Sequence, residues 1–72
     1  MVREIKITHK NIGECRVTEE CSYMQRIGTD PCSLFVIHDC DLKEVSRNMF
    51  SAADLAAYDR FVQETVIDPE AA

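Results

Sequence analysis

Four cysteines are the residues of this chain with the most versatile chemistry. Cys15, Cys21, Cys32 and Cys40 follow the spacing C-x5-C-x10-C-x7-C. Thiolates bind zinc or iron–sulfur clusters and form disulfides, whereas protonated cysteines pack in protein cores as small hydrophobic residues. The spacing contains no C-x-x-C pair, the feature common to zinc ribbons, ferredoxins and thioredoxin-like proteins. The sequence therefore favours buried free thiols, with disulfides and a metal site as the alternatives.

The polar cluster His38-Asp39-Cys40-Asp41 follows the most apolar run of the chain. In the metal alternative this cluster acts with the other thiols, so the candidate ligands are Cys15, Cys21, Cys32, His38 and Cys40. A tetrahedral zinc site needs four donors within about 2.0–2.3 Å of the ion. Cys32 and Cys40 would lie about 25 Å apart along a straight strand, which argues against both joining one site. We therefore expect no cofactor, with zinc or an iron–sulfur cluster as the alternative.

His38 and Cys40 also have the residue types of a general base and a thiol nucleophile. The sequence has no G-x-S-x-G, H-E-x-x-H or glycine-rich phosphate-loop motif. Asp41 is better explained as a helix cap than as a catalytic acid. We predict no catalytic residue and expect a protein that is not an enzyme.

The first half of the chain predicts strands. Apolar and polar residues alternate over 2–8, and a second strand is expected over 14–17, after the turn residues 11–13. Residues 19–27 can be read as a strand or as a helix. We favour the helix because Thr18 can cap it, acidic residues occupy its first turn and Gly28 follows its end.

A central strand covered on both faces is predicted for 32–38, which is apolar without polar alternation. Two helices are expected to follow. Asp41-Leu42-Lys43-Glu44 resembles a capping box, and Ser51-Ala52-Ala53-Asp54 resembles another. The predicted fold is a single α+β domain over 1–72, with a three-stranded, mostly antiparallel sheet covered on one side by two C-terminal helices. Its order is β-β-(α)-β-α-α.

The expected core combines the central strand with one stripe of the last helix. Its members are Leu34, Phe35, Val36, Ile37, Leu55, Tyr58 and Val62, and the stripe continues to Val66. Phe61 is expected at the margin of the stripe, partly exposed. Asp59 falls inside the apolar arc of the helical wheel, so it should lie at the rim of the core or pair with a cation.

Size and composition limit the class of protein. The chain has 72 residues, 46% of them hydrophobic and 29% charged, which is typical of one folded globular domain. No stretch approaches the 18 consecutive apolar residues of a membrane span. The N-terminus has no apolar region like that of a secretory signal, so we expect a cytoplasmic protein.

Charge is concentrated towards the C-terminus. The whole chain has a net charge of −5, and residues 51–72 hold one arginine against five acidic residues, a net of −4. An acidic chain does not favour direct binding to nucleic acid, whose phosphates require a basic surface. The predicted partner surface is on the last helix and consists of Asp54, Asp59, Phe61, Glu64 and Asp68.

These observations predict a small acidic protein-binding module without enzymatic activity. Its partner is another protein with a basic surface, on which it acts as an inhibitor or regulator, or a second copy of itself. The alternative function is a cysteine-based metal-binding or redox accessory module.

Overall fold

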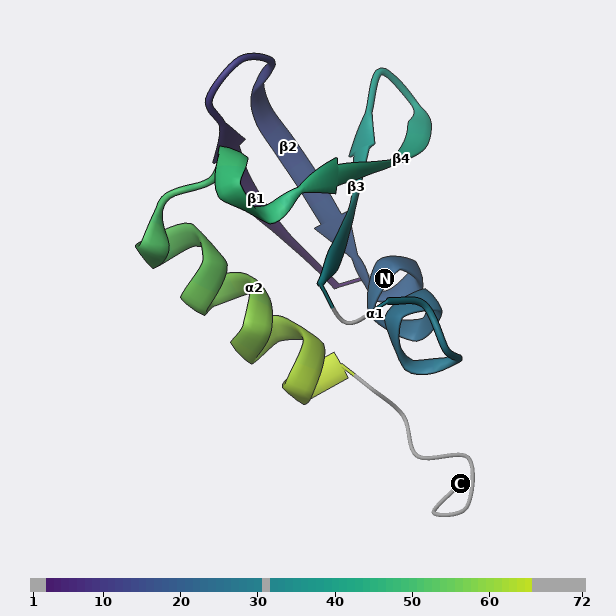
Figure 1. Cartoon of the computed structure of the whole chain (residues 1–72). Coiled ribbons are helices and arrows are strands. Elements are labelled where there is room, and N and C mark those ends of the chain that lie inside the picture. Colours follow the sequence, from purple (N-terminus) through teal and green to yellow (C-terminus); the bar gives the residue numbers. More distant parts are fainter. Residues whose placement is uncertain (1–2, 31, 66–72) are drawn as a thin grey trace.

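Four antiparallel strands form one sheet in the order β1-β2-β3-β4 (Figure 1). The computed structural model describes residues 3–30 and 32–65. Its elements are β1 (Glu4–His9), β2 (Gly13–Thr18), α1 (Glu19–Arg26), β3 (Ser33–His38), β4 (Asp41–Ser46), the 3-10 helix η1 (Arg47–Met49) and α2 (Ala52–Thr65). The predicted α+β class and antiparallel sheet are confirmed. The predicted three strands and the predicted element order are wrong, because the sheet has four strands and the order is β-β-α-β-β-α.

The first hairpin follows the alternation of its sequence. Ile5 and Ile7 pair with Val17 and Cys15, so these four side chains share one face of the sheet. Gly13 begins β2 with φ +85°, a backbone conformation that suits glycine. Both strands are therefore located as predicted, within two residues at each end, although Val2 lies outside the described residues.

The ambiguous segment after β2 is helical, as favoured. α1 begins after Thr18, which has an extended backbone, and carries Glu19 and Glu20 in its first turn. It ends at Arg26, and Gly28 then adopts φ +113°. The acidic first turn and basic last turn both complement the helix dipole.

The largest difference from the sequence prediction is β4. Asp39 and Cys40 have φ values of +51° and +69°, and they form a two-residue turn with the positive φ values that type I′ hairpins require. The chain then pairs with β3 from His38↔Asp41 to Ser33↔Ser46. The predicted helix beginning at Asp41 is wrong because this turn sends the backbone back along β3, where an extended chain completes the ladder.

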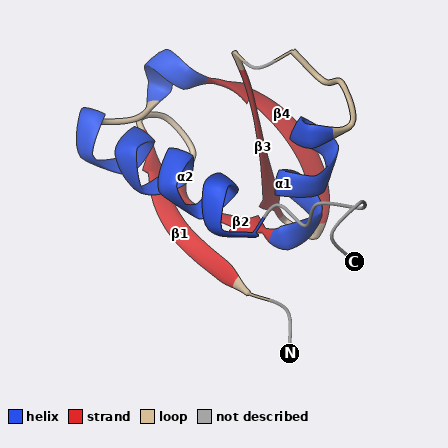
Figure 2. Ribbon diagram, turned by 90° about the horizontal axis from the view of Figure 1, so that it is seen from below, coloured by secondary structure: helices blue, strands red, loops and turns tan. Residues whose placement is uncertain are grey.

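Both helices lie on the face of the sheet that carries Ile7, Cys15 and Val17 (Figure 2). α2 runs beside β1, and α1 packs against β2, β3 and α2. The buried apolar core consists of Ile7, Cys15, Val17, Cys21, Leu34, Phe35, Val36, Phe50, Tyr58 and Phe61. No helix in the described part of the chain is long and apolar enough to span a membrane.

The buried face of α2 is rotated from the predicted stripe. Tyr58 is buried as predicted, but Leu55 and Val62 are only partly buried. Phe61, expected at the margin, is 3% exposed. Tyr58 and Phe61 are three positions apart, so both fit one helix face. On the strand side, Leu34, Phe35 and Val36 are buried as predicted, whereas Ile37 is only partly buried.

Candidate functional site

The four cysteines divide into two buried and two exposed free thiols. Cys15 and Cys21 lie in the core, as expected of small hydrophobic residues. Burial raises the pKa of the Cys15 thiol, and the hydrogen bond with the backbone of His9 offsets only part of this effect. Cys15 therefore favours the protonated form, which is a poor metal ligand and a poor nucleophile.

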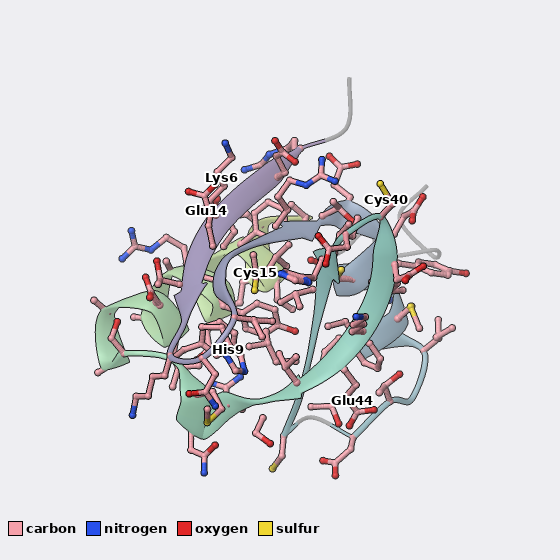
Figure 3. The ribbon with its side chains drawn as sticks, turned by 90° about the horizontal axis from the view of Figure 1, so that it is seen from above. Lys6, His9, Glu14, Cys15, Cys40 and Glu44 are labelled. Atoms are coloured by element: carbon pink, nitrogen blue, oxygen red, sulfur yellow. The ribbon has the colours of Figure 1, made fainter. Side chains whose placement is uncertain are left out.

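Cys32 and Cys40 are exposed, against the expectation of burial, and lie beyond opposite ends of β3. Cys40 occupies the tip of the β3–β4 hairpin, away from the core position of Cys15 (Figure 3). His38 Nδ1 lies 3.1 Å from Asp39 Oδ2. Among residues 3–30 and 32–65, no group of three or more His, Cys, Asp and Glu side chains is arranged to hold a metal ion. The candidate ligands are thus not gathered into one site.

The predicted acidic surface of α2 is largely engaged within the molecule. The Asp59 carboxylate accepts two hydrogen bonds from Arg47 Nη2, at 3.0 and 3.1 Å, so Asp59 is both exposed and paired. Glu64 Oε2 lies 3.3 Å from Arg3 Nη2. These arginines reduce the negative charge that α2 presents to a partner.

The predicted partner surface also included Asp54, Phe61 and Asp68. Asp54 Oδ2 accepts a hydrogen bond from the Thr8 backbone N–H at 3.3 Å. Phe61 is buried, with the Arg3 guanidinium 5.7 Å from its ring centroid, so its side chain offers little surface to a partner. Asp68 lies outside the described residues.

The β1 edge is capped by the fold at its C-terminal end, around Thr8 and Lys10. Besides the bond from Thr8 to Asp54, the Lys10 N–H donates to the Met49 carbonyl of η1 at 2.9 Å. His9, a residue that the sequence did not single out, packs edge-on against Phe50 with ring centroids 5.3 Å apart. Its Nδ1 accepts hydrogen bonds from two backbone N–H groups of the next turn. His9 therefore acts as a buried structural residue of this covered edge.

The β4 edge differs because, among residues 3–30 and 32–65, β3 is the only strand that pairs with it. In a two-residue hairpin the closing pair, here His38 and Asp41, exchanges both backbone hydrogen bonds, and this pattern alternates along the ladder. The backbone N–H and C=O groups of Leu42, Glu44 and Ser46 therefore point away from β3. Every side chain of β4 except Val45 is exposed. This edge was not predicted from the sequence, because the residues of β4 were expected to form a helix.

A groove of about 380 Å³ adjoins the second half of β4. Its lining residues are Asp30, Cys32, Ser33, Glu44, Val45, Ser46, Arg47 and Asn48. Ser33 Oγ donates to Glu44 Oε1 at 2.7 Å, and the Cys32 N–H donates to Asp30 Oδ1 at 2.8 Å. Figure 3 shows Glu44 projecting from β4. The groove thus places two carboxylates beside an unpaired strand edge.

A second hollow, of about 400 Å³, lies between α1 and the end of α2. Glu19, Glu20, Tyr23, Met24 and Thr65 line it.

No protein-family model matches the chain, and neither the curated proteins nor the solved structures contain a match.

Proposed function

We propose that this chain is a small, non-enzymatic protein-binding module that pairs through β4 with an extended segment of a larger protein. By occupying that segment, it acts as a regulator or inhibitor of its partner. The observation that carries the proposal is the contrast between the covered β1 edge and the open β4 edge of one sheet.

An open edge favours strand addition for a simple physical reason. Its outward N–H and C=O groups are already aligned, so an extended segment gains main-chain hydrogen bonds without a change in the sheet. The outward groups of Leu42, Glu44 and Ser46 provide this template on β4. The exposed side chains on both faces of β4 can then contact alternate side chains of the added segment.

The overall charge supports a basic partner. The chain has a net charge of −5, which speeds association with a positively charged surface. The arginine-paired carboxylates of α2 contribute less to direct contact, so we place the docking surface on β4 and not on the helix.

A proline on the edge tests the proposal. Glu44→Pro removes an outward N–H group and should retain the β3–β4 bonds, because proline is tolerated on edge strands where the N–H faces solvent. Glu44→Thr is the matched control, since it removes the same carboxylate but keeps the N–H. Tagged wild type and both variants are used for affinity capture from extracts of the cells that make the protein, and enriched proteins are purified for binding measurements.

We expect a partner that binds wild type and Glu44→Thr but loses at least tenfold in affinity for Glu44→Pro. The proposal is overturned if no protein is enriched, or if a purified partner binds Glu44→Pro as tightly as wild type. Sedimentation of the free protein tests self-pairing: a dimer that Glu44→Pro converts to a monomer would contradict a larger partner. Elemental analysis that finds stoichiometric zinc or iron would instead favour the cysteine-based alternative.

A further inference from the structure

We infer that the segment accepted by β4 carries a lysine or arginine opposite Glu44 and an apolar residue opposite Leu42. This inference rests on the proposed strand addition and specifies the chemistry of the partner. In an antiparallel arrangement, the segment reads basic–any–apolar from its N-terminus.

The alternation of the strand fixes which side chains act together. Leu42 and Glu44 are two residues apart, so their side chains lie on the same face of β4. The backbone N–H and C=O groups of both residues point away from β3. Each residue would therefore form a hydrogen-bonded pair with the residue directly opposite on an added strand. Such pairs have Cα atoms about 5.5 Å apart, with side chains on the same face. A side chain opposite Glu44 therefore lies beside the Glu44 carboxylate.

Charge determines the preferred side chain at that position. Glu44 and Asp30 both line the groove, where the Ser33 hydroxyl donates to the Glu44 carboxylate and the Cys32 backbone N–H donates to the Asp30 carboxylate. Four basic residues pair with other carboxylates, namely Arg3, Lys6, Arg16 and Arg47. Arg47, the only arginine in the groove lining, is held by Asp59. The groove thus presents two carboxylates that accept hydrogen bonds from neutral groups, and a lysine or arginine of the added strand would give them a cationic neighbour.

Leu42 determines the second position. Leu42 is 41% exposed, which places it among the exposed large apolar residues of the described chain. An apolar side chain opposite Leu42 would cover this surface, since cross-strand neighbours on one face contact each other. Because antiparallel strands run in opposite directions, the residue opposite Leu42 is two positions after the residue opposite Glu44.

Three synthetic peptides test this pattern on the full ¹⁵N-labelled chain. The matching probe is acetyl-Thr-Thr-Arg-Thr-Val-Thr-Thr-amide, the charge control replaces Arg by Glu, and the order control exchanges Arg and Val. Backbone amide shifts of Leu42, Glu44 and Ser46 are followed by NMR up to millimolar peptide. We expect the matching probe to bind about two- to fivefold more tightly than either control, the range that cross-strand charge pairs provide.

Glu44→Lys should reverse the preference, so that the Glu peptide binds more tightly than the Arg peptide. Its unperturbed amide shifts outside β4 confirm that the variant folds. Equal binding of all three peptides at β4 overturns the inferred pattern but leaves strand addition intact. If none of the peptides shifts the β4 amides, strand addition itself is contradicted, and the proposed function fails with it.

Discussion

The two edges of the sheet have the same kind of backbone but different surroundings. At the β1 edge, Asp54 of α2 accepts the Thr8 N–H, and Met49 of η1 accepts the Lys10 N–H. At the other edge, β4 pairs with β3 alone within the part of the chain that the structure describes. The difference arises because the chain leaves β4 through η1 and crosses to β1, where α2 then lies (Figure 1). The fold therefore uses its last third to cover one edge and leaves the other available.

The substitution with the largest expected effect on stability removes a buried aromatic ring of α2. Phe61→Ala should lower the free energy of unfolding by about 3–5 kcal/mol, because the ring projects from α2 into the core and is almost fully buried there. Leu42→Ala, on the open edge, should change it by less than about 0.5 kcal/mol. Urea denaturation measures both. Similar losses of unfolding free energy in the two variants would contradict the difference in packing between the two regions.

The covered region should also respond to alkaline pH through Tyr58. Burial raises the pKa of the Tyr58 phenol from 10.0 to about 12. Between these values the unfolded chain has lost the phenol proton while the folded protein still holds it. Stability from this group is therefore complete below pH 10 and is lost as pH rises towards 12. Thermal melts should show this loss in wild type and in Tyr23→Phe, but less of it in Tyr58→Phe. An unchanged profile in Tyr58→Phe would contradict this assignment.

A smaller effect is expected where α2 caps the β1 edge. Asp54→Ala removes the acceptor of the Thr8 N–H and should cost about 1 kcal/mol in unfolding free energy. At the β4 edge, Glu44→Thr removes only the acceptor of the Ser33 hydroxyl, so any loss of stability should leave the Thr8 amide unaffected. Hydrogen exchange of the Thr8 amide should quicken in Asp54→Ala only. Unaltered Thr8 exchange would show that Asp54 does not cover this edge.

The smallest predicted effect concerns the turn that creates β4. Cys40 has φ +69°, a conformation that glycine adopts with less strain. Cys40→Gly should therefore stabilise the protein by about 0.5–1 kcal/mol. Cys40→Ser keeps the Cβ atom and should leave stability unchanged, which separates backbone strain from loss of the thiol. Destabilisation by glycine would contradict the hairpin geometry.

The parts of the fold that sequence patterns predicted are those with strong local signals. Alternation located β1 and β2, and acidic and basic residues at opposite ends located α1. The Ser51 cap was also predicted: its hydroxyl accepts the Asp54 N–H at 3.2 Å. In each case the local preference and the tertiary packing favour the same structure.

The second hairpin could not be predicted because its signals are weak. Asp39-Cys40 is not one of the glycine-containing pairs that usually indicate a type I′ turn. β4 is exposed on both faces except at Val45, so it lacks the apolar alternation of a half-buried strand. The candidate site was missed for the same reason, since an open edge is a property of sheet topology and not of any motif. Nor could spacing show that Arg3 and Arg47 engage the acidic residues of α2.

Amide hydrogen exchange of the free protein, resolved residue by residue by NMR, tests the open edge most directly. We expect fast exchange at Leu42, Glu44 and Ser46, whose N–H groups point away from β3. We expect slow exchange at Lys43 and Val45, which pair with β3, and at Thr8 on the β1 edge. Slow exchange at all three outward amides of β4 would contradict an open edge, because it would show that this edge is already covered in the free protein.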